Sequence, residues 1–528
     1  MKLERLHEYL AVFLATTGGM LLAVYAGRLS GSGHLGTLAM IIAGLIIGFF
    51  LFTLKTRIWM FIPMAWMLTG QVPILPLPFS VRDLVVFAVA AVMLTLMALK
   101  LVKRRPKYGW LDFALFVNLL YLVTVFIRNP VGTQAFNSER VGGRPYFEVA
   151  VACLAYLVLI RSSASLKEIR WFPVVVTVGG FLQAAIGLIT MFFPATVPLV
   201  LPFYTAITTE QYDAMDVRRQ GEGSGRFAYL TYLGRPITDA MVSYFPPLTL
   251  INPFYLVRFL IYVSGGVLLL LSGFRSAIIG MAFSFLIAAY IKRGISDLIK
   301  ASFIAVPFII FLLLGQGTLF NLPKPVQRAL SFLPAQWDSA AVDDAEGSTR
   351  WRVEMWKYML LESKYIDNKL LGDGFGFSQN EMALMQHLTT SNLGSSQEWF
   401  MLVGAVHSGP VSTIRYAGYV GLALYSWFLI AAAVTAYRIV QRTRGSEMFL
   451  PSLFVCIPVL YEPFYYWVIF GSYDSAFPNA IYAAGLLKML ENSLNDQDVR
   501  KSKMDQPDPK ENLLQGAKHK PHLSLTPA

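Results

Sequence analysis

Long apolar stretches recur along the whole of this 528-residue chain. Each is long enough to cross the hydrocarbon layer of a membrane, about 30 Å thick, as an α-helix. Within lipid, every backbone amide has to be paired inside the protein, which leaves only helices and closed β-barrels. A membrane β-barrel needs strands of about ten residues in which apolar and polar side chains alternate, whereas the stretches here are continuously apolar. The sequence therefore predicts an all-α polytopic membrane protein with about 12–14 transmembrane helices.

The composition and the order of apolar and polar segments define the organisation. Charged residues make up 14% of the chain, which is about half of the share in soluble proteins. The apolar runs predict membrane helices near 9–26, 35–54, 57–75, 82–101, 110–127, 146–161, 171–193, 227–250, 253–272, 276–292, 300–316, 414–437, 447–470 and 474–490. We therefore expect four parts: N-terminal membrane helices (1–316), a large polar loop (317–412), C-terminal membrane helices (413–490), and a polar tail (491–528) that is disordered and cytoplasmic.

Clusters of Lys and Arg indicate how the chain is oriented, because such clusters gather on cytoplasmic loops. They occur at 100–107, 161–170, 292–300 and 438–444. Two clusters on the same side must be separated by an even number of crossings. The segment 227–250 therefore has to count as a span, although it contains Arg235 and Asp239, charges that are costly inside a membrane. Both termini are then cytoplasmic, and three segments lie on the outer face, namely 194–226, 272–277 and 317–412.

The basic residues that could carry chemistry all fall on this predicted outer face. They are Arg218, Arg219 and Arg226 before the weak span, Arg275 in the 272–277 turn, and His407 near the end of the long loop. Arg binds phosphate through parallel hydrogen bonds and stays charged at any relevant pH. A His with a pKa near neutrality can take the proton from a sugar hydroxyl. The set suits transfer from a lipid-linked pyrophosphate, whose developing charge the guanidinium groups would absorb without a metal ion.

Each of these features also has a plainer interpretation. An Arg at the end of a membrane helix is commonly an interfacial anchor, and a lone His in a loop is commonly a structural hydrogen-bond donor. The glycine triplet Gly372, Gly374 and Gly376 commonly forms only a turn. The functional prediction therefore depends on the spacing and order of these residues, and on no single one of them.

That spacing resembles a known family. Leu370-Leu-Gly-Asp-Gly-Phe-Gly376 forms a glycine turn, and Gly418 and Gly421 follow His407 by eleven and fourteen positions. Together with the Ser272-Gly-Phe-Arg-Ser-Ala277 turn and Gly225-Arg-Phe227, this pattern resembles the O-antigen ligase and O-antigen polymerase superfamily. These are bacterial inner-membrane glycosyltransferases that act on undecaprenyl-pyrophosphate-linked glycans.

The resemblance implies a GT-C-like fold whose active site faces the periplasm. It implies metal-independent, inverting glycosyl transfer that uses no cofactor, with His407 as general base on the acceptor hydroxyl. Arg275 would bind the donor diphosphate together with Arg226 or Arg219, and the choice among these two and Arg218 stays open. Five glycines would shape the loop and the helix after it, namely Gly372, Gly374, Gly376, Gly418 and Gly421.

The resemblance also implies the partners. The donor would be an undecaprenyl-pyrophosphate-linked glycan, and the acceptor a growing glycan or a lipid A core sugar. The lipid bilayer surrounds the protein, and other polysaccharide-assembly proteins are candidate neighbours. Nucleic acid is not expected, because cytoplasmic loops account for the net charge of +12.

Two alternatives remain open at this stage. Ligase and polymerase share one site, and the departures from the common pattern on the acceptor side favour a polymerase of O-antigen or exopolysaccharide. The other class is a flippase or transporter of the same lipid-linked glycans. Transporters commonly have internal repeats and short loops, whereas this chain has a long outer loop and no fixed-period repeat, which argues against that class.

Overall fold

The computed structural model describes residues 24, 53–72, 79–102, 106–131, 142–162, 164–200, 204, 227–362, 364–376, 401–402, 404 and 406–504. The chain divides into two compact units, one of Met1–Ile58 with Ala91–Val102 and one of Trp59–Ala90 with Lys103–Ala528. The tertiary contacts discussed below all lie within the second unit.

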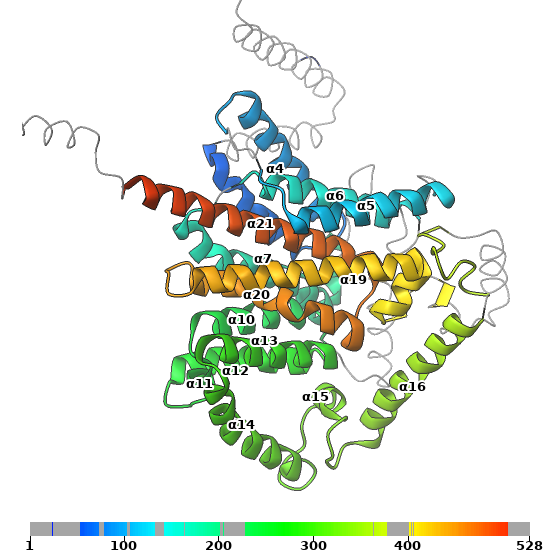
Figure 1. Cartoon of the computed structure of the whole chain (residues 1–528). Helices are drawn as coiled ribbons and strands as arrows, with labels where there is room; N and C mark the ends of the chain where they lie inside the picture. The colour runs from blue at the N-terminus through cyan, green and yellow to red at the C-terminus, as the bar shows by residue number, and fades with distance from the viewer. Residues whose placement is uncertain are drawn as a thin grey trace, which may run out of the picture. The chain divides into compact units, whose positions relative to one another are not determined.

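The described residues are almost entirely helical, and their β-pairing is limited to two isolated bridges. In chain order (Figure 1) the elements are η1 (Lys55–Met60), α3 (Phe61–Trp66), α4 (Val81–Ala98), α5 (Trp110–Arg128), α6 (Gly143–Leu159), α7 (Leu166–Phe192), η3 (Pro194–Thr196), α8 (Val197–Val200), α10 (Leu230–Tyr244), α11 (Pro247–Leu250), α12 (Leu256–Leu271), α13 (Arg275–Arg293), α14 (Ile295–Gly315), α15 (Lys324–Leu330), α16 (Ser339–Leu361), α19 (Gly409–Thr443), α20 (Phe449–Phe464), η4 (Tyr465–Ile469) and α21 (Tyr473–Met504).

Among the described residues, seven helices are long and apolar enough to cross a membrane. They are α4, α5, α7, α13, α14, α19, and α20 with its continuation η4. Helix α12 is also apolar but shorter. The structure thus has the helices of an all-α, multi-pass membrane protein, as the sequence predicts. The expected spans 9–26 and 35–54 lie in the part of the chain that is not described, apart from residues 24, 53 and 54.

One expected helix, 57–75, is shorter than its apolar run. Helix α3 ends at Trp66, and the chain then turns back through a bridge between Gln71 and Ser80. The amide of Gly70 donates to the hydroxyl of Tyr204 at 3.0 Å, so this N–H is taken by a side chain and not by a helical carbonyl.

The weak span 227–250 is also divided. Helix α10 ends at Tyr244, and the short α11 begins at Pro247. Between them, Pro246 and Pro247 lack amide hydrogens, which interrupts the helical hydrogen-bond pattern. Within α10, Arg235 pairs with Asp239 at 2.8 Å, so the two charges that made this span doubtful neutralise each other.

The long polar loop contains helices that its composition did not suggest. Helices α15 and α16 both lie within 317–412, and α19 begins at Gly409, before the expected start at 414. The tail boundary at 490 is likewise wrong, because α21 continues to Met504. Its extension is held by neighbours: Asn492 donates to the Ile160 carbonyl at 2.9 Å, and Arg442 bonds Asn495 at 2.7 Å.

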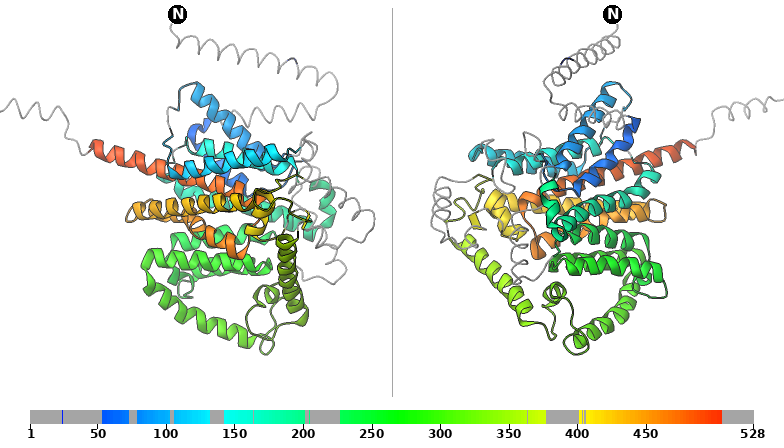
Figure 2. Two further views of the ribbon diagram at one scale, coloured as in Figure 1. Left: turned by 45° about the vertical axis from the view of Figure 1, so that its right-hand side comes forward. Right: turned by 180° about the vertical axis from the view of Figure 1, so that it is seen from behind.

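Two groups of helices carry the packing of the second unit. Helix α19 packs on α5, α20 and α21, while α10 packs on α7, α12, α13 and α20. Helix α16 runs from α15 back to the start of α19, as both views in Figure 2 show, and it contacts both. The loop helices therefore join the turn before α13 to the segment before α19, where the predicted site residues lie.

Candidate functional site

Some of the predicted site residues lie outside the described residues. Arg219 and Arg226 are among these, as is Arg218, so their proposed roles stay predictions. Arg275, His407 and the five glycines are described.

Arg275 is the first residue of α13 and is held by the loop helices. Its Nε donates to the Arg328 carbonyl at 3.3 Å, and its two terminal nitrogens donate to Ser331 at 2.9 Å and Thr349 at 3.4 Å. Arg328 in turn donates to the carbonyl of Gly273, in the turn before α13, at 3.1 Å. These contacts go to carbonyl and hydroxyl oxygens, and they fix the orientation of the two guanidinium groups.

A third arginine, Arg352, lies one turn after Thr349 on α16. Burial, together with the charges of Arg328 and Arg275, lowers the pKa of the Arg352 guanidinium. Its Nε is buried and has no hydrogen-bond partner among the residues that the structure describes. We call these three residues the arginine cluster. The like charges of Arg275 and Arg328 disfavour the charged form of Arg352.

His407 lies directly before α19 in a constrained backbone. Its φ of +53° is in the left-handed region that side chains other than Gly rarely adopt. The buried residue before it, Val406, accepts a hydrogen bond at its carbonyl from Trp356 Nε1 at 2.7 Å. The half-buried imidazole stacks on Phe470, with ring centroids 5.6 Å apart and planes 25° apart. The histidine is therefore fixed on both its backbone and its ring.

Two short connections bring His407 into the neighbourhood of the arginine cluster. The first is the π-helical turn η4 with the residue after it: Tyr465 donates to the Ser276 carbonyl at 3.1 Å, next to Arg275, while Phe470 stacks on His407. The second is α16, where Arg352 and Trp356 are one helical turn apart. Short runs of contacts thus link the segments that carry Arg275 and His407, which are more than a hundred positions apart in the sequence.

The glycine turn docks onto a break in α19. Gly418, with φ of +71° and ψ of −178°, divides α19 into 409–417 and 419–443. A Cβ atom at Gly418 would collide with the Leu370 carbonyl, and one at Gly372 would collide with the backbone of Ala417. Only glycines at both positions allow the two backbones to touch.

Backbone hydrogen bonds cross this contact in both directions. The amides of Asp373 and Gly374 donate to the carbonyls of Arg415 and Tyr416 at 3.1 and 2.9 Å. The amides of Tyr419 and Val420 donate to the carbonyls of Lys369 and Leu370 at 2.9 and 3.1 Å. The turn therefore satisfies the carbonyls and amides that the break in α19 leaves without helical partners. Because its amides are used in this way, the turn is a structural joint and not a phosphate cradle.

The other predicted glycines pack closely against neighbouring helices. A Cβ at Gly374 would lie 3.0 Å from the Tyr146 hydroxyl, and one at Gly376 would lie 3.1 Å from Asn129 Nδ2. At Gly421 it would collide with the Ala417 side chain. Each of the three therefore permits a close contact with α5, α6 or α19.

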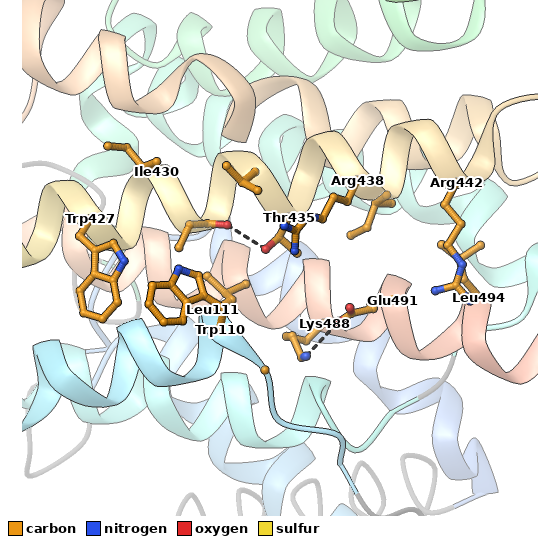
Figure 3. Close-up of a pocket in the computed structure, with 14 residues that line it drawn as sticks. Trp110, Leu111, Trp427, Ile430, Thr435, Arg438, Arg442, Lys488, Glu491 and Leu494 are labelled. Carbon is orange, nitrogen blue, oxygen red and sulfur yellow. Dashed lines mark hydrogen bonds and ion pairs between the residues drawn. The ribbon is translucent and has the colours of Figure 1, made fainter.

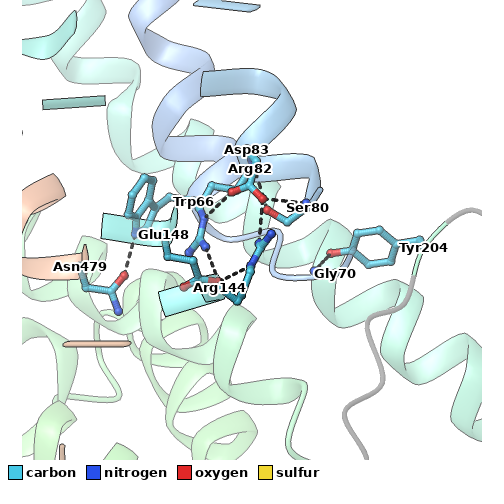
Figure 4. Close-up of polar contacts among 9 residues, drawn as sticks. All are labelled: Trp66, Gly70, Ser80, Arg82, Asp83, Arg144, Glu148, Tyr204 and Asn479. Atoms are coloured by element: carbon cyan, nitrogen blue, oxygen red, sulfur yellow. Dashed lines mark hydrogen bonds and ion pairs between the residues drawn. The ribbon is translucent and has the colours of Figure 1, made fainter. Parts of the chain in front are cut away.

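A second group of charges contrasts with the arginine cluster (Figure 4). Arg144 pairs with Asp83 at 2.7 Å and with Glu148 at 3.1 Å, and Arg82 pairs with Glu148 at 3.2 Å. We call these four residues the α4–α6 ion cluster. Two cations meet two carboxylates there, so its charge is balanced, and we assign it a structural role.

Sequence reasoning missed Arg328, Arg352 and Phe470. Arg352 had a signal, because it precedes Trp356 by four residues on the same helical face. Arg328 and Phe470 had none, since each reaches the site from a distant part of the chain. In the described part of the chain, no group of three or more His, Cys, Asp or Glu side chains could hold a metal ion. The metal-free chemistry nevertheless stays a prediction.

No family model matches the chain, and a search of curated proteins finds no match.

Proposed function

We propose that this protein is a membrane glycosyltransferase of the O-antigen ligase and polymerase type. It would transfer a glycan from an undecaprenyl-pyrophosphate carrier to a sugar hydroxyl at the periplasmic face of the bacterial inner membrane. The observation that carries the proposal is the arginine cluster, a positive site beside the segment that holds His407. Its charge suits a diphosphate, and the imidazole of His407 suits a hydroxyl acceptor.

Each group then has a defined role. His407 takes the proton of the acceptor hydroxyl while that oxygen attacks the anomeric carbon of the donor sugar. The bond from that carbon to the diphosphate oxygen breaks, and the lipid diphosphate leaves with the electron pair. Arg275, Arg328 and Arg352, with Arg226 or Arg219, would stabilise the charge on the leaving group. Attack opposite the leaving group inverts the anomeric centre.

Between the two forms of this chemistry, we favour a polymerase of O-antigen or exopolysaccharide. The segment around His407 differs on the acceptor side from the common pattern, with Ser408 directly after the histidine and Tyr416 near the break in α19. The growing chain would then be the acceptor.

The test is complementation in cells that accumulate the lipid-linked glycan, with products separated by size on a gel. We expect His407→Ala and Arg275→Ala to abolish product while the protein remains in the membrane. Loss of the ladder indicates a polymerase, and a ladder that stays on the lipid carrier indicates a ligase. Arg350→Gln is the matched control, because Arg350 is exposed on α16 two residues before Arg352.

A binding measurement separates transfer from transport. With purified protein and lipid-linked donor, His407→Ala should lose turnover and keep donor binding, whereas Arg275→Ala should weaken binding. A flippase would be little affected by loss of His407. Normal product from both variants would refute the proposed site.

A further inference from the structure

A cavity lies along the second half of α19 (Figure 3). It has a volume of about 360 Å³ and is lined by the start of α5, the second half of α19, and α21. His407 precedes the first residue of α19, whereas the cavity is lined by residues from Trp427 to Arg442. The proposed active site does not reach this end of the helix, so the function of the cavity is a separate question.

One part of the cavity is apolar and aromatic. Trp110 of α5 and Trp427 of α19 meet edge to face, with ring centroids 5.2 Å apart. Ile430 and Val434 continue this wall along α19, and both are exposed. In a membrane-spanning helix, exposed apolar side chains of this kind face lipid chains.

The other part of the cavity is basic, and its cations are not equally paired. Lys488 is held by Asp112 at 3.1 Å and Glu491 at 2.7 Å. Arg442 pairs with the exposed Asp498, and such a surface ion pair contributes little. Arg438 lines the cavity, is exposed, and has no hydrogen-bond or ion-pair partner among the described residues.

The spacing of the two parts matches one leaflet of a membrane. Eleven residues separate Trp427 from Arg438, which is about 16 Å along a helix that rises about 1.5 Å per residue. One leaflet is half of a hydrocarbon core about 30 Å thick. A headgroup at Arg438 would therefore place the end of an acyl chain near the Trp110–Trp427 pair.

We propose that this cavity binds a membrane phospholipid with an anionic headgroup, its phosphate at Arg438 and Arg442 and one acyl chain along α19 to Trp427. The unpaired guanidinium and its neighbour one turn away supply the charge complement of a phosphodiester. Basic pockets between helices on the cytoplasmic side are suited to anionic headgroups, and the sequence places this end of α19 in the cytoplasm.

The experiment uses the full chain purified in detergent and dioleoyl phosphatidylglycerol as the probe, with bound lipid counted by native mass spectrometry. Dioleoyl phosphatidylcholine, which has the same chains and no net charge, is the lipid control. We expect wild-type protein to retain phosphatidylglycerol in preference, and Arg438→Gln to lose about five-fold in bound lipid. Because Arg438 has no described partner, its replacement breaks no known contact, and a thermal unfolding curve checks this.

Arg293→Gln is the matched protein control. Arg293 is the last residue of α13, is exposed, and is a basic residue at the same predicted face as Arg438. This variant should bind phosphatidylglycerol as wild type does. Equal binding of the lipid by Arg438→Gln and wild type, or equal retention of the two lipids by wild type, would overturn the proposal.

Discussion

The α4–α6 ion cluster and the arginine cluster both contain buried or half-buried arginines, but the charges around these arginines differ in sign. In the first, Arg144 is 2% exposed and is matched by Asp83, which is 0% exposed, at 2.7 Å. In the second, the buried Nε of Arg352 has no hydrogen-bond partner among the described residues, and the charges of Arg328 and Arg275 act on its guanidinium group. A balanced pair holds helices together, whereas a guanidinium group desolvated beside other cations costs stability and is a candidate for binding a ligand. The difference separates structural arginines from those we assign to function.

The largest expected effect tests the balanced cluster. Replacing Arg144 with Gln removes the nearer cation of the buried Asp83, which lies at 2.7 Å, and leaves Arg82 at 3.7 Å. We expect a loss of about 3 kcal/mol in the free energy of unfolding. Thermal unfolding of the purified protein measures it. The double replacement Arg144→Met with Asp83→Leu should recover most of the loss, because it removes both charges. If Arg144→Gln were as stable as Arg350→Gln, the cluster would not have a structural role.

The next effect tests the arginine cluster through activity. Replacing Arg352 with Gln should lower turnover about 100-fold, since a charge that stabilises the leaving group is lost. The measurement is glycan product per unit time from lipid-linked donor. Arg350→Gln, on the same helix and exposed, should keep wild-type turnover. Equal rates for the two variants would remove Arg352 from the proposed site.

A third prediction concerns the joint that supports the site. In Gly418→Ala, an alanine has to adopt the positive φ of +71° that glycine has at this position, and its methyl group collides with the Leu370 carbonyl. Gly445 has a similar φ of +81° but nothing within 4 Å of the added Cβ, so Gly445→Ala measures the conformational cost alone. We expect Gly418→Ala to be less stable than Gly445→Ala by about 2 kcal/mol. Equal unfolding temperatures of Gly418→Ala and Gly445→Ala would show that the turn at 369–374 can move away from the added methyl group without loss of stability.

The sequence predicts the parts of this molecule that depend on local patterns. The apolar runs predicted helices such as α5, α7 and α14 to within a few residues, because a run of such length can be satisfied in lipid only as a helix. The break at Gly418 was not predicted, because it depends on a turn that arrives from residues 369–374. Among the site residues, His407 and Arg275 carried a recognisable spacing. Arg328 carried none, because its role depends on α15 packing beside the turn before α13.

The smallest expected effect is an increase in the free energy of unfolding, whereas the replacements of Arg144 and Gly418 should lower it. We expect the Arg352 charge to lower the free energy of unfolding, because burial and the charges of Arg328 and Arg275 disfavour its charged form. Removing the charge in Arg352→Gln should raise the free energy of unfolding by about 0.5 kcal/mol, while the same variant loses activity. Any comparable charge removal in the α4–α6 ion cluster should do the reverse. Thermal unfolding without ligand gives the sign directly.

Inorganic pyrophosphate gives a second test of the difference in stability between wild-type protein and Arg352→Gln. An anion that binds the folded protein raises its stability in proportion to the logarithm of its concentration. Inorganic pyrophosphate should therefore raise the unfolding temperature of wild-type protein, and it should raise that of Arg352→Gln less. The order of stability of the two proteins would then reverse as pyrophosphate is added. If the wild-type protein were the more stable one without any anion, the Arg352 charge would be balanced within the protein, and the distinction between the two clusters would be wrong.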